Sequence, residues 1–201
     1  MFRLVLDPDA FFRDGAADRL AGASTVVGAT GVANTLGAVV LLYWTWGAVS
    51  RAAPIVTMTY VLTIAGTIVG QFAVWLGFSA AFYALSALLG GSGSFRRLFT
   101  AVGWGFYPSI AGGLLSAGAI LSRGWGVDFP DSAGALGPFV RSLTSGPLFE
   151  VVSLVGIVLL VWNASNWVFA VKHTRDLPLA RALAVVSVPI AVAVAWRLLS
   201  L

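Results

Sequence analysis

The chain has 201 residues, of which 59% are hydrophobic and only 10% are charged. A soluble domain is about 25% charged, so the composition excludes one and indicates a membrane protein with room for a single bundle. Cysteine is absent, which excludes disulfides, a thiol nucleophile and thiolate metal sites. The net charge of +4 indicates membrane orientation rather than a nucleic-acid partner, because no basic patch interleaves with aromatic residues on a polar surface.

The first part of the chain, residues 1–22, carries aspartates and arginines and lacks the apolar run of a cleavable signal peptide. We expect it to be a cytoplasmic segment. Phe11, Phe12 and Leu20 alternate with charged residues, a pattern that favours either a short interfacial helix on the inner leaflet or a disordered leader.

The remainder, residues 23–201, is predicted to form one membrane domain of five spans. The first span ends in an aromatic cluster suited to a membrane interface, and the third and fourth are joined by a Gly-, Ser- and Pro-rich connection at residues 123–150. A charged turn at residues 172–176 separates the last two. The expected spans cover residues 23–49, 55–89, 99–121, 151–171 and 178–200.

The second span decides the topology. Residues 52–95 contain no Asp, Glu, Lys, Arg or His. One helix over residues 55–89 would be about 52 Å long, whereas the hydrocarbon core is only about 30 Å thick. Such a helix has to tilt, bend or emerge from the bilayer. A hairpin of two spans needs a turn, yet Pro, Asn and Asp are missing between Ile55 and Leu89.

The basic residues distinguish the two topologies. With five spans, the side that holds the N-terminus has eight of them: Arg3, Arg13, Arg19, Arg96, Arg97, Lys172, Arg175 and Arg181. The opposite side has four: Arg51, Arg123, Arg141 and Arg197. With six spans this positive-inside bias disappears. The sequence therefore predicts an all-α polytopic membrane helix bundle with five transmembrane helices and a cytoplasmic N-terminus.

Small residues line one face of the long second span, within about 60° of one direction on a helical wheel. They include a GxxxG match, and such faces let two helices approach closely in lipid. The partner is either another span of the same chain or a second copy or another membrane protein. The predicted helix-packing residues are Gly66, Gly70, Ala73, Gly77, Ala80 and Ala84.

A few polar residues also fall within the spans. Asn163 and Asn166 share one helix face, and Gln71 lies in the second span. They predict either hydrogen bonds between helices or a polar pathway for a small solute. The span interiors carry no acidic residue, which argues against a proton-relay pump.

We find no catalytic, cofactor-binding or metal-binding set. Residues 90–93 match the Gly-x-Ser-Gly of intramembrane serine proteases, but catalysis would need a base within reach of Ser92. His173 is the only histidine and lies in a charged turn. A flexible loop is the better interpretation of these glycines, and the chain is expected not to be an enzyme.

Several short motifs, taken in order, resemble the prokaryotic branch of the Yip (Ypt-interacting-protein) domain family. An overlong second span precedes the second motif, and a span bearing Trp162 and Trp167 precedes the last. The motifs are Asp-Pro-Asp-Ala-Phe-Phe at residues 7–12, Gly-Gly-Ser-Gly-Ser-Phe at 90–95, Trp-Gly-Phe-Tyr-Pro-Ser-Ile at 104–110 and Ala-Arg-Ala at 180–182.

The resemblance implies five spans, a cytoplasmic N-terminus and no known catalysis. Eukaryotic relatives act in vesicle trafficking and contact small GTPases. This chain lacks the Asp-Leu-Tyr-Gly-Pro segment of those relatives, and Tyr107 and Pro108 have lost the spacing of their Gly-Tyr-x-x-x-Pro motif. GTPase binding is therefore not expected here.

The expected function is a membrane-organising or adaptor role through helix–helix contacts in a prokaryotic plasma membrane. The expected partners are the lipid bilayer and a homo-oligomer or another membrane protein, with no cofactor. The alternative is a small-solute permease or transporter subunit.

Overall fold

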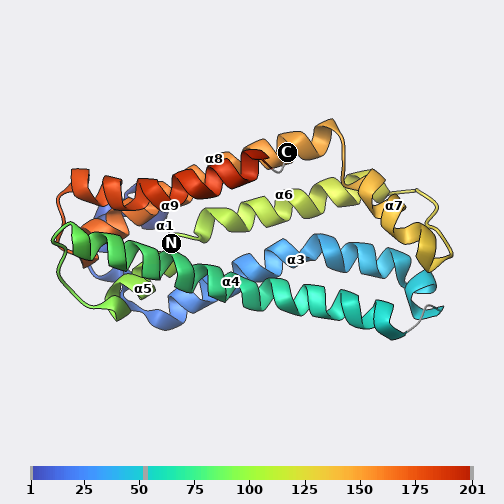
Figure 1. Ribbon diagram of the computed structural model, residues 1–201, viewed down its shortest axis with the longest axis horizontal. Helices are drawn as coiled ribbons and strands as arrows, with labels where there is room; N and C mark the ends of the chain where they lie inside the picture. Colours follow the sequence, from blue (N-terminus) through green and yellow to red (C-terminus); the bar gives the residue numbers. More distant parts are fainter. Residues whose placement is uncertain (1, 52–53, 200–201) are drawn as a thin grey trace.

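The computed structural model describes residues 2–51 and 54–199, which form an elongated bundle of helices lying side by side (Figure 1). Five stretches in this part of the chain are long and apolar enough to cross a membrane, which confirms the predicted polytopic α-helical fold. The elements are α1 (Phe2–Leu6), α2 (Pro8–Arg13), the 3₁₀ turn η1 (Ala16–Asp18), α3 (Leu20–Arg51), α4 (Pro54–Leu88), α5 (Phe95–Trp104), α6 (Tyr107–Gly124), α7 (Ala133–Leu143), α8 (Pro147–Thr174) and α9 (Leu179–Leu199).

The uncharged stretch forms one continuous helix, α4, as the single-helix interpretation predicts. No turn-forming residue interrupts it. Its exposed hydroxyls are satisfied locally: Thr59, Thr63 and Thr67 each donate to the carbonyl four residues earlier at 2.8 Å. This matters because hydrocarbon offers hydroxyl groups no other partner. The helix ends at Leu88, and the turn after it contains Gly90, whose φ of +81° suits a glycine.

The third predicted span, residues 99–121, is not one helix. It is divided into α5 and α6 at Gly105 and Phe106, so that the whole crossing covers Phe95–Gly124. Pro108 explains the break, because it has no N–H to donate to the carbonyl of Trp104 and disfavours helical geometry at the residue before it.

The connection after the third span contains a further helix, α7. Leu143 packs with Leu41 and Ile120, and Leu136 packs with Val49. This helix therefore covers the ends of α3 and α6 that lie far from the N-terminus. The sequence analysis did not predict this helix, because its glycines and Pro138 are typical of a loop.

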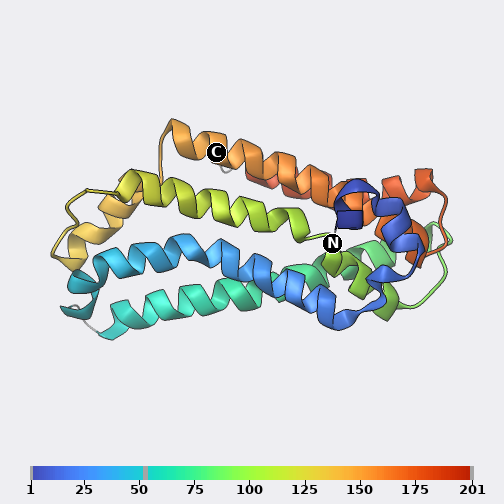
Figure 2. The same ribbon diagram turned by 180° about the vertical axis from the view of Figure 1, so that it is seen from behind.

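The N-terminal segment folds back onto the bundle instead of presenting its phenylalanines to lipid. Phe11 and Phe12 are 5% and 2% exposed and pack with Ala101 of α5 and Ala170 of α8. Viewed from behind, the segment lies against the end of the bundle where α8 and α9 are joined (Figure 2). Of the three apolar residues that the interfacial-helix alternative named, Phe11 and Phe12 are thus buried in the protein, whereas Leu20 is exposed.

Asp9 fastens this segment to α8. Its Oδ1 lies 2.5 Å from Nζ of Lys172 and 2.8 Å from Nε2 of His173. These hydrogen bonds, first from Lys172 and then from His173, lower the pKa of Asp9 from 3.8 to about 2.

Arg175 joins two turns at the same end of the bundle. It is 2% exposed, donates to Ser86 Oγ at 2.9 Å and to the carbonyl of Gly91 at 2.9 Å, and also bonds the carbonyl of Gly93. Its guanidinium lies 4.3 Å from the centroid of the Tyr83 ring. The loop after α4 is therefore held against the turn between α8 and α9.

Helices α3 and α6 approach closely at Gly113. A Cβ placed there would lie 2.5 Å from the carbonyl carbon of Ala33 and 2.7 Å from the backbone nitrogen of Asn34. In lipid, helices associate through such close van der Waals contact rather than through the hydrophobic effect. Gly113 thus sets the spacing at the centre of the bundle.

We expect Gly113→Ala to destabilise the protein by about 1–3 kcal/mol, because the added methyl group collides with rigid backbone. Gly118→Ala is the matched control, since Gly118 lies on the same helix with open space around it. Both changes gain the same helix propensity, so the difference in the free energy of unfolding in detergent isolates the collision. Equal stabilities of the two variants would contradict the close contact.

The lowered pKa of Asp9 predicts how the N-terminal segment responds to pH. An ionised Asp9 stabilises the docked segment above pH 3.8, and this contribution is lost as the pH falls through about 2. Asp9→Asn should remove it at every pH and make residues 2–18 more accessible to protease at neutral pH. Asp14→Asn should not, because Asp14 pairs with Arg3 and Arg13 of the same segment. Equal protease sensitivity of the two variants would disprove this role.

Candidate functional site

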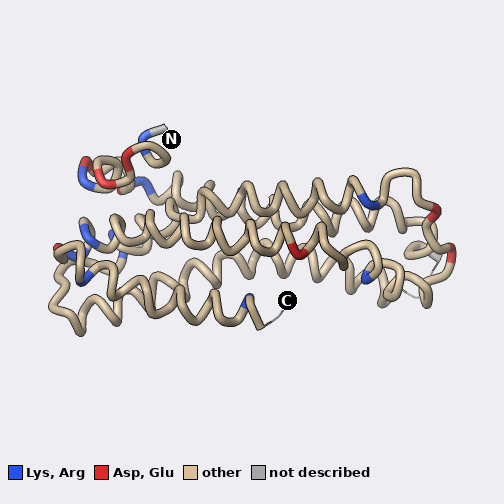
Figure 3. Tube along the Cα trace, turned by 90° about the horizontal axis from the view of Figure 1, so that it is seen from above, with Lys and Arg blue, Asp and Glu red and all other residues tan. Residues whose placement is uncertain are grey.

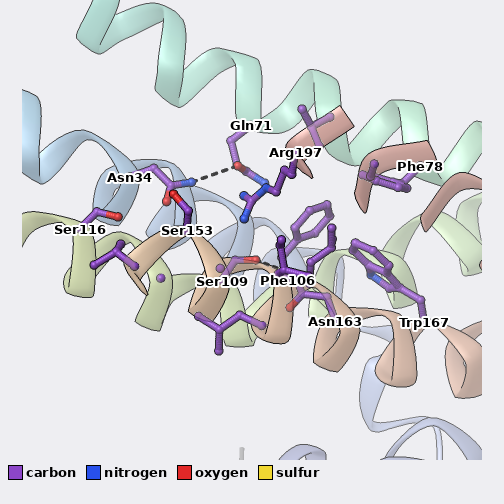
Figure 4. A pocket seen from close by; sticks show the side chains of 18 residues that line it. Asn34, Gln71, Phe78, Phe106, Ser109, Ser116, Ser153, Asn163, Trp167 and Arg197 are labelled. Carbon is purple, nitrogen blue, oxygen red and sulfur yellow. Dashed lines mark hydrogen bonds between the residues drawn. The ribbon is translucent and has the colours of Figure 1, made fainter. Parts of the chain in front are cut away.

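A cavity of about 530 Å³ with polar walls lies between the helices of the bundle (Figure 4). Gln71, which lines it, is equally far along α4 from Pro54 and from Leu88. Helices α3, α4, α6, α8 and α9 all contribute to its walls. The polar side chains that line it are Asn34, Gln71, Ser109, Ser116, Ser153, Asn163 and Arg197.

The break in the third span brings the beginning of α6 to this cavity. Phe106 precedes α6 and Ser109 lies in its first turn, and both side chains line the wall. No side chain caps this helix N-terminus. Broken helices with their ends at a central cavity are how membrane proteins build polar sites at depth.

Asn163 is the most buried polar residue of the cavity, at 2% exposure. Its Nδ2 donates to Ser109 Oγ at 2.6 Å, so it does make a hydrogen bond between helices. Its Oδ1 has no hydrogen-bond partner among the described residues. A buried carbonyl oxygen without a donor is costly, so this atom is suited to accept a hydrogen bond from a molecule in the cavity.

A pair of amide side chains, one from α3 and one from α4, lines another part of the cavity wall. Asn34 Nδ2 and Gln71 Oε1 are 3.5 Å apart, at the limit of a hydrogen bond. Both side chains remain available to a molecule in the cavity.

Arg197 is the cationic residue of the cavity, and its position differs from the expectation. The charge count placed it on the side of the membrane opposite the N-terminus, but its side chain points into the cavity (Figure 4). Helix α9 rises only about 24 Å between Arg181 and Arg197, less than the hydrocarbon thickness. Gly156 of α8 makes room, since a Cβ there would lie 2.6 Å from Nη1 of Arg197.

Arg197 is also set apart from the other basic residues. Most charged residues gather at the end of the bundle that holds the N-terminal segment, a smaller group lies at the opposite end, and an acidic and a basic position lie between them (Figure 3). The cavity walls contain no Asp or Glu. Glu150 lies in the first turn of α8, three residues before Ser153, but it is exposed and is not part of the walls.

Aromatic rings close one side of the cavity. The rings of Phe78 and Trp167 stack with centroids 4.8 Å apart, and Phe106 meets Trp167 edge-on at 5.0 Å. The indole of Trp167 donates to the carbonyl of Val102 at 2.8 Å, close to the break before α6. This network fixes the wall beside Asn163.

Of the predicted polar-pathway residues, the structure brings Gln71 and Asn163 together in the cavity. Asn166 is separate: it is 1% exposed, it does not line the cavity, and its Oδ1 also lacks a partner among the described residues.

The predicted helix-packing residues lie mostly on the exposed side of α4. Gly66, Ala73, Gly77, Ala80 and Ala84 are exposed, and Gly70 is half-buried. A Cβ added at any of the three glycines would meet nothing within 4 Å. The buried residues Trp75, Ser79 and Phe82 lie on the opposite side of α4. This face of α4 is therefore open in the structure, and its packing against a partner stays a prediction.

Ser92 and His173 have separate partners. The Ser92 hydroxyl donates to Asp176 Oδ2 at 3.0 Å, whereas His173 pairs with Asp9. Gly93, at φ +100°, lies so near Thr174 that a Cβ there would be 2.5 Å from the Thr174 carbonyl oxygen, so this position requires glycine. In the described part of the chain, no cluster of three metal-ligating side chains occurs.

The sequence did not single out the serines of the cavity or Arg197. Ser109, Ser116 and Ser153 are ordinary in membrane helices, so no local signal marked them. Arg197 did carry one: it follows Arg181 by only about 24 Å of helix, less than the thickness of the hydrocarbon core.

The comparisons with known proteins agree with the architecture. The family model described as the Yip1 domain matches residues 2–199. No curated protein and no solved structure matches the chain. The match covers the N-terminal segment, all five crossings and every residue of the cavity walls, and the chain therefore belongs to the Yip1 domain family.

Proposed function

We propose that this multi-pass membrane protein is a non-enzymatic adaptor that organises other membrane proteins or further copies of itself through helix–helix contacts. The observation that carries the proposal is the exposed small-residue face of α4. It lies opposite the buried face of the helix, and its glycines have open space around them.

The physical chemistry of lipid supports this use of α4. A helix surface of Gly and Ala gains little from contact with acyl chains but permits close packing with another helix backbone. Only 6% of the most apolar part of α4 is buried within the protein, which leaves this long surface for a partner. Membership of the Yip1 domain family, which is not known for catalysis, is consistent with an adaptor.

We place the protein in a prokaryotic plasma membrane with its N-terminal segment in the cytoplasm. The end of the bundle that holds this segment also contains Arg96, Arg97, Lys172, Arg175 and Arg181. Because Arg197 lines the cavity, it no longer counts among the basic residues of the opposite surface, and the positive-inside bias toward this end becomes stronger.

The adaptor proposal predicts that Gly70→Leu abolishes most of the association. The leucine meets open space within the monomer, so the fold should persist while close approach of a partner is blocked. The measurement is cross-linking of the protein in native-like membranes, followed by mass analysis of the products.

Ala65→Leu is the matched control, because Ala65 is also exposed on α4 but lies about 90° from the centre of the small-residue face. Its cross-linked products should equal those of the wild type. Only monomer in the wild type, or an unaffected Gly70→Leu variant, would rule out the adaptor.

A second candidate function is a small-solute permease, favoured by the cavity at mid-depth. We expect purified protein in liposomes to take up a small polar solute, and Asn163→Leu to abolish this flux because the leucine fills and dehydrates the cavity wall. Val158→Leu, on the exposed side of α8, should transport normally. No flux of any solute in a panel of polyols, amino acids and organic phosphates would eliminate the permease.

A further inference from the structure

We infer that the N-terminal segment, residues 2–18, is a latch that keeps the central cavity closed on the side of the bundle where this segment lies. The latch rests on the second candidate function, because a permease has to open its cavity toward each side of the membrane in turn. It concerns the closure of the cavity rather than the identity of a solute, so its release is measured without transport.

Aromatic rings close the cavity toward the N-terminal segment. Phe78 is the wall residue nearest to the end of α4 at Leu88, and Trp167 is the one nearest to the end of α8 at Thr174. Both helix ends lie at the end of the bundle that holds the segment. Beyond the rings, the fully buried core residues on this side include Phe82, Val102 and Val171. The rings therefore have to move before a solute can pass from the cavity to this side.

The break in the third span links the segment to these rings. Phe11 meets the ring of Trp104 edge-on, with centroids 5.4 Å apart, and Trp104 is the last residue of α5. A Cβ at Gly105 would collide with the ring of Trp167, so this ring rests on the Gly105 backbone. Phe106 then meets Trp167 edge-on at 5.0 Å. Three consecutive residues thus connect the docked segment to the cavity wall.

The docked segment offsets the cost of burying Trp104. Nε1 of this residue is buried without a hydrogen-bond partner among the described residues, and a buried donor that lacks an acceptor destabilises the fold. Packing against Phe11 and the other apolar residues of the segment holds the indole in place. Once the segment leaves, this N–H regains water and the break beside it loses its support. The rings of Phe106 and Trp167 are then free to part.

The segment can leave the bundle without unfolding a span. Its helical elements are short, none longer than the six residues of α2, and it lies on the surface at one end of the bundle (Figure 2). Its attachment consists of a few buried side chains and the contacts of Asp9 with Lys172 and His173. Segments with few buried contacts open locally at a free energy well below that of global unfolding.

The test exploits the absence of cysteine from the chain. Ser109→Cys places a single thiol in the cavity wall that also contains Phe106. A methanethiosulfonate reagent that cannot cross the bilayer is added to sealed vesicles whose outer surface carries the N-terminal segment. Mass analysis then follows the rate at which the thiol is modified. We expect slow modification of Ser109→Cys alone, and complete modification after unfolding in SDS.

Two further changes, each made in the Ser109→Cys protein, release the latch by different means. Phe11→Ala removes the ring that contacts Trp104, and Asp9→Asn removes the charge that pairs with Lys172. Each should raise the rate of modification from this side about tenfold or more, because the open state becomes more populated.

Leu6→Ala and Asp14→Asn are the matched controls within the segment. Leu6 is 79% exposed, and Asp14 pairs only with Arg3 and Arg13 of the segment itself. Neither change should alter the rate of modification.

An unchanged rate in both Phe11→Ala and Asp9→Asn would overturn the latch, and so would equal acceleration by the two controls. Should Phe11→Ala fail to fold, Asp9→Asn decides, because it replaces one oxygen atom by an amide nitrogen. Faster modification without flux of any solute supports the latch and eliminates the permease. Flux together with unchanged modification eliminates the latch alone.

Discussion

Hydrocarbon offers no hydrogen bonds, so every polar group between the two ends of this bundle has to be satisfied inside the protein. The long helix α4 meets that constraint with its own backbone, because three threonine hydroxyls donate hydrogen bonds to the carbonyl groups one turn earlier. The third span meets it differently. Pro108 breaks the ladder between α5 and α6, and near that break the indole of Trp167 donates to the carbonyl of Val102. The interruption between α5 and α6, together with this hydrogen bond from Trp167, places Ser109 beside Asn163, and these two residues form part of one wall of the cavity.

The two halves of the molecule serve different purposes as a result. At the charged end, Asp9 and Arg175 fasten the N-terminal segment and the loop after α4 to the turn between α8 and α9. Around the middle, the bundle leaves two surfaces without a partner in the chain. One is the small-residue face of α4, which is apolar and directed outward. The other is the polar cavity, which points inward. The chain, a member of the Yip1 domain family, thus has an open apolar helix face on its outside and a cavity with polar walls between its helices.

The cavity also shows why charge counting along a membrane sequence has a limit. Arg197 counts as a residue of the far surface by its place at the end of the last span. Its helix is the shortest of the five crossings, and Gly156 on the neighbouring helix admits its side chain. Depth thus depends on helix length and on the packing of a neighbour, neither of which is local to the residue.

The sequence by itself determined that the protein lies in a membrane, how many times it crosses, and that the second crossing is one long helix. Each of these depends on composition and on charge over many consecutive residues. It also identified Gln71 and Asn163 as unusual in lipid. Only the tertiary structure decided that these two share a cavity while Asn166 does not, that the small face of α4 points away from the bundle, and that Phe11 and Phe12 are buried. Helical periodicity assigns a residue to a face, but the neighbour of that face is set by contacts between distant segments, such as that of Gly113 with Ala33.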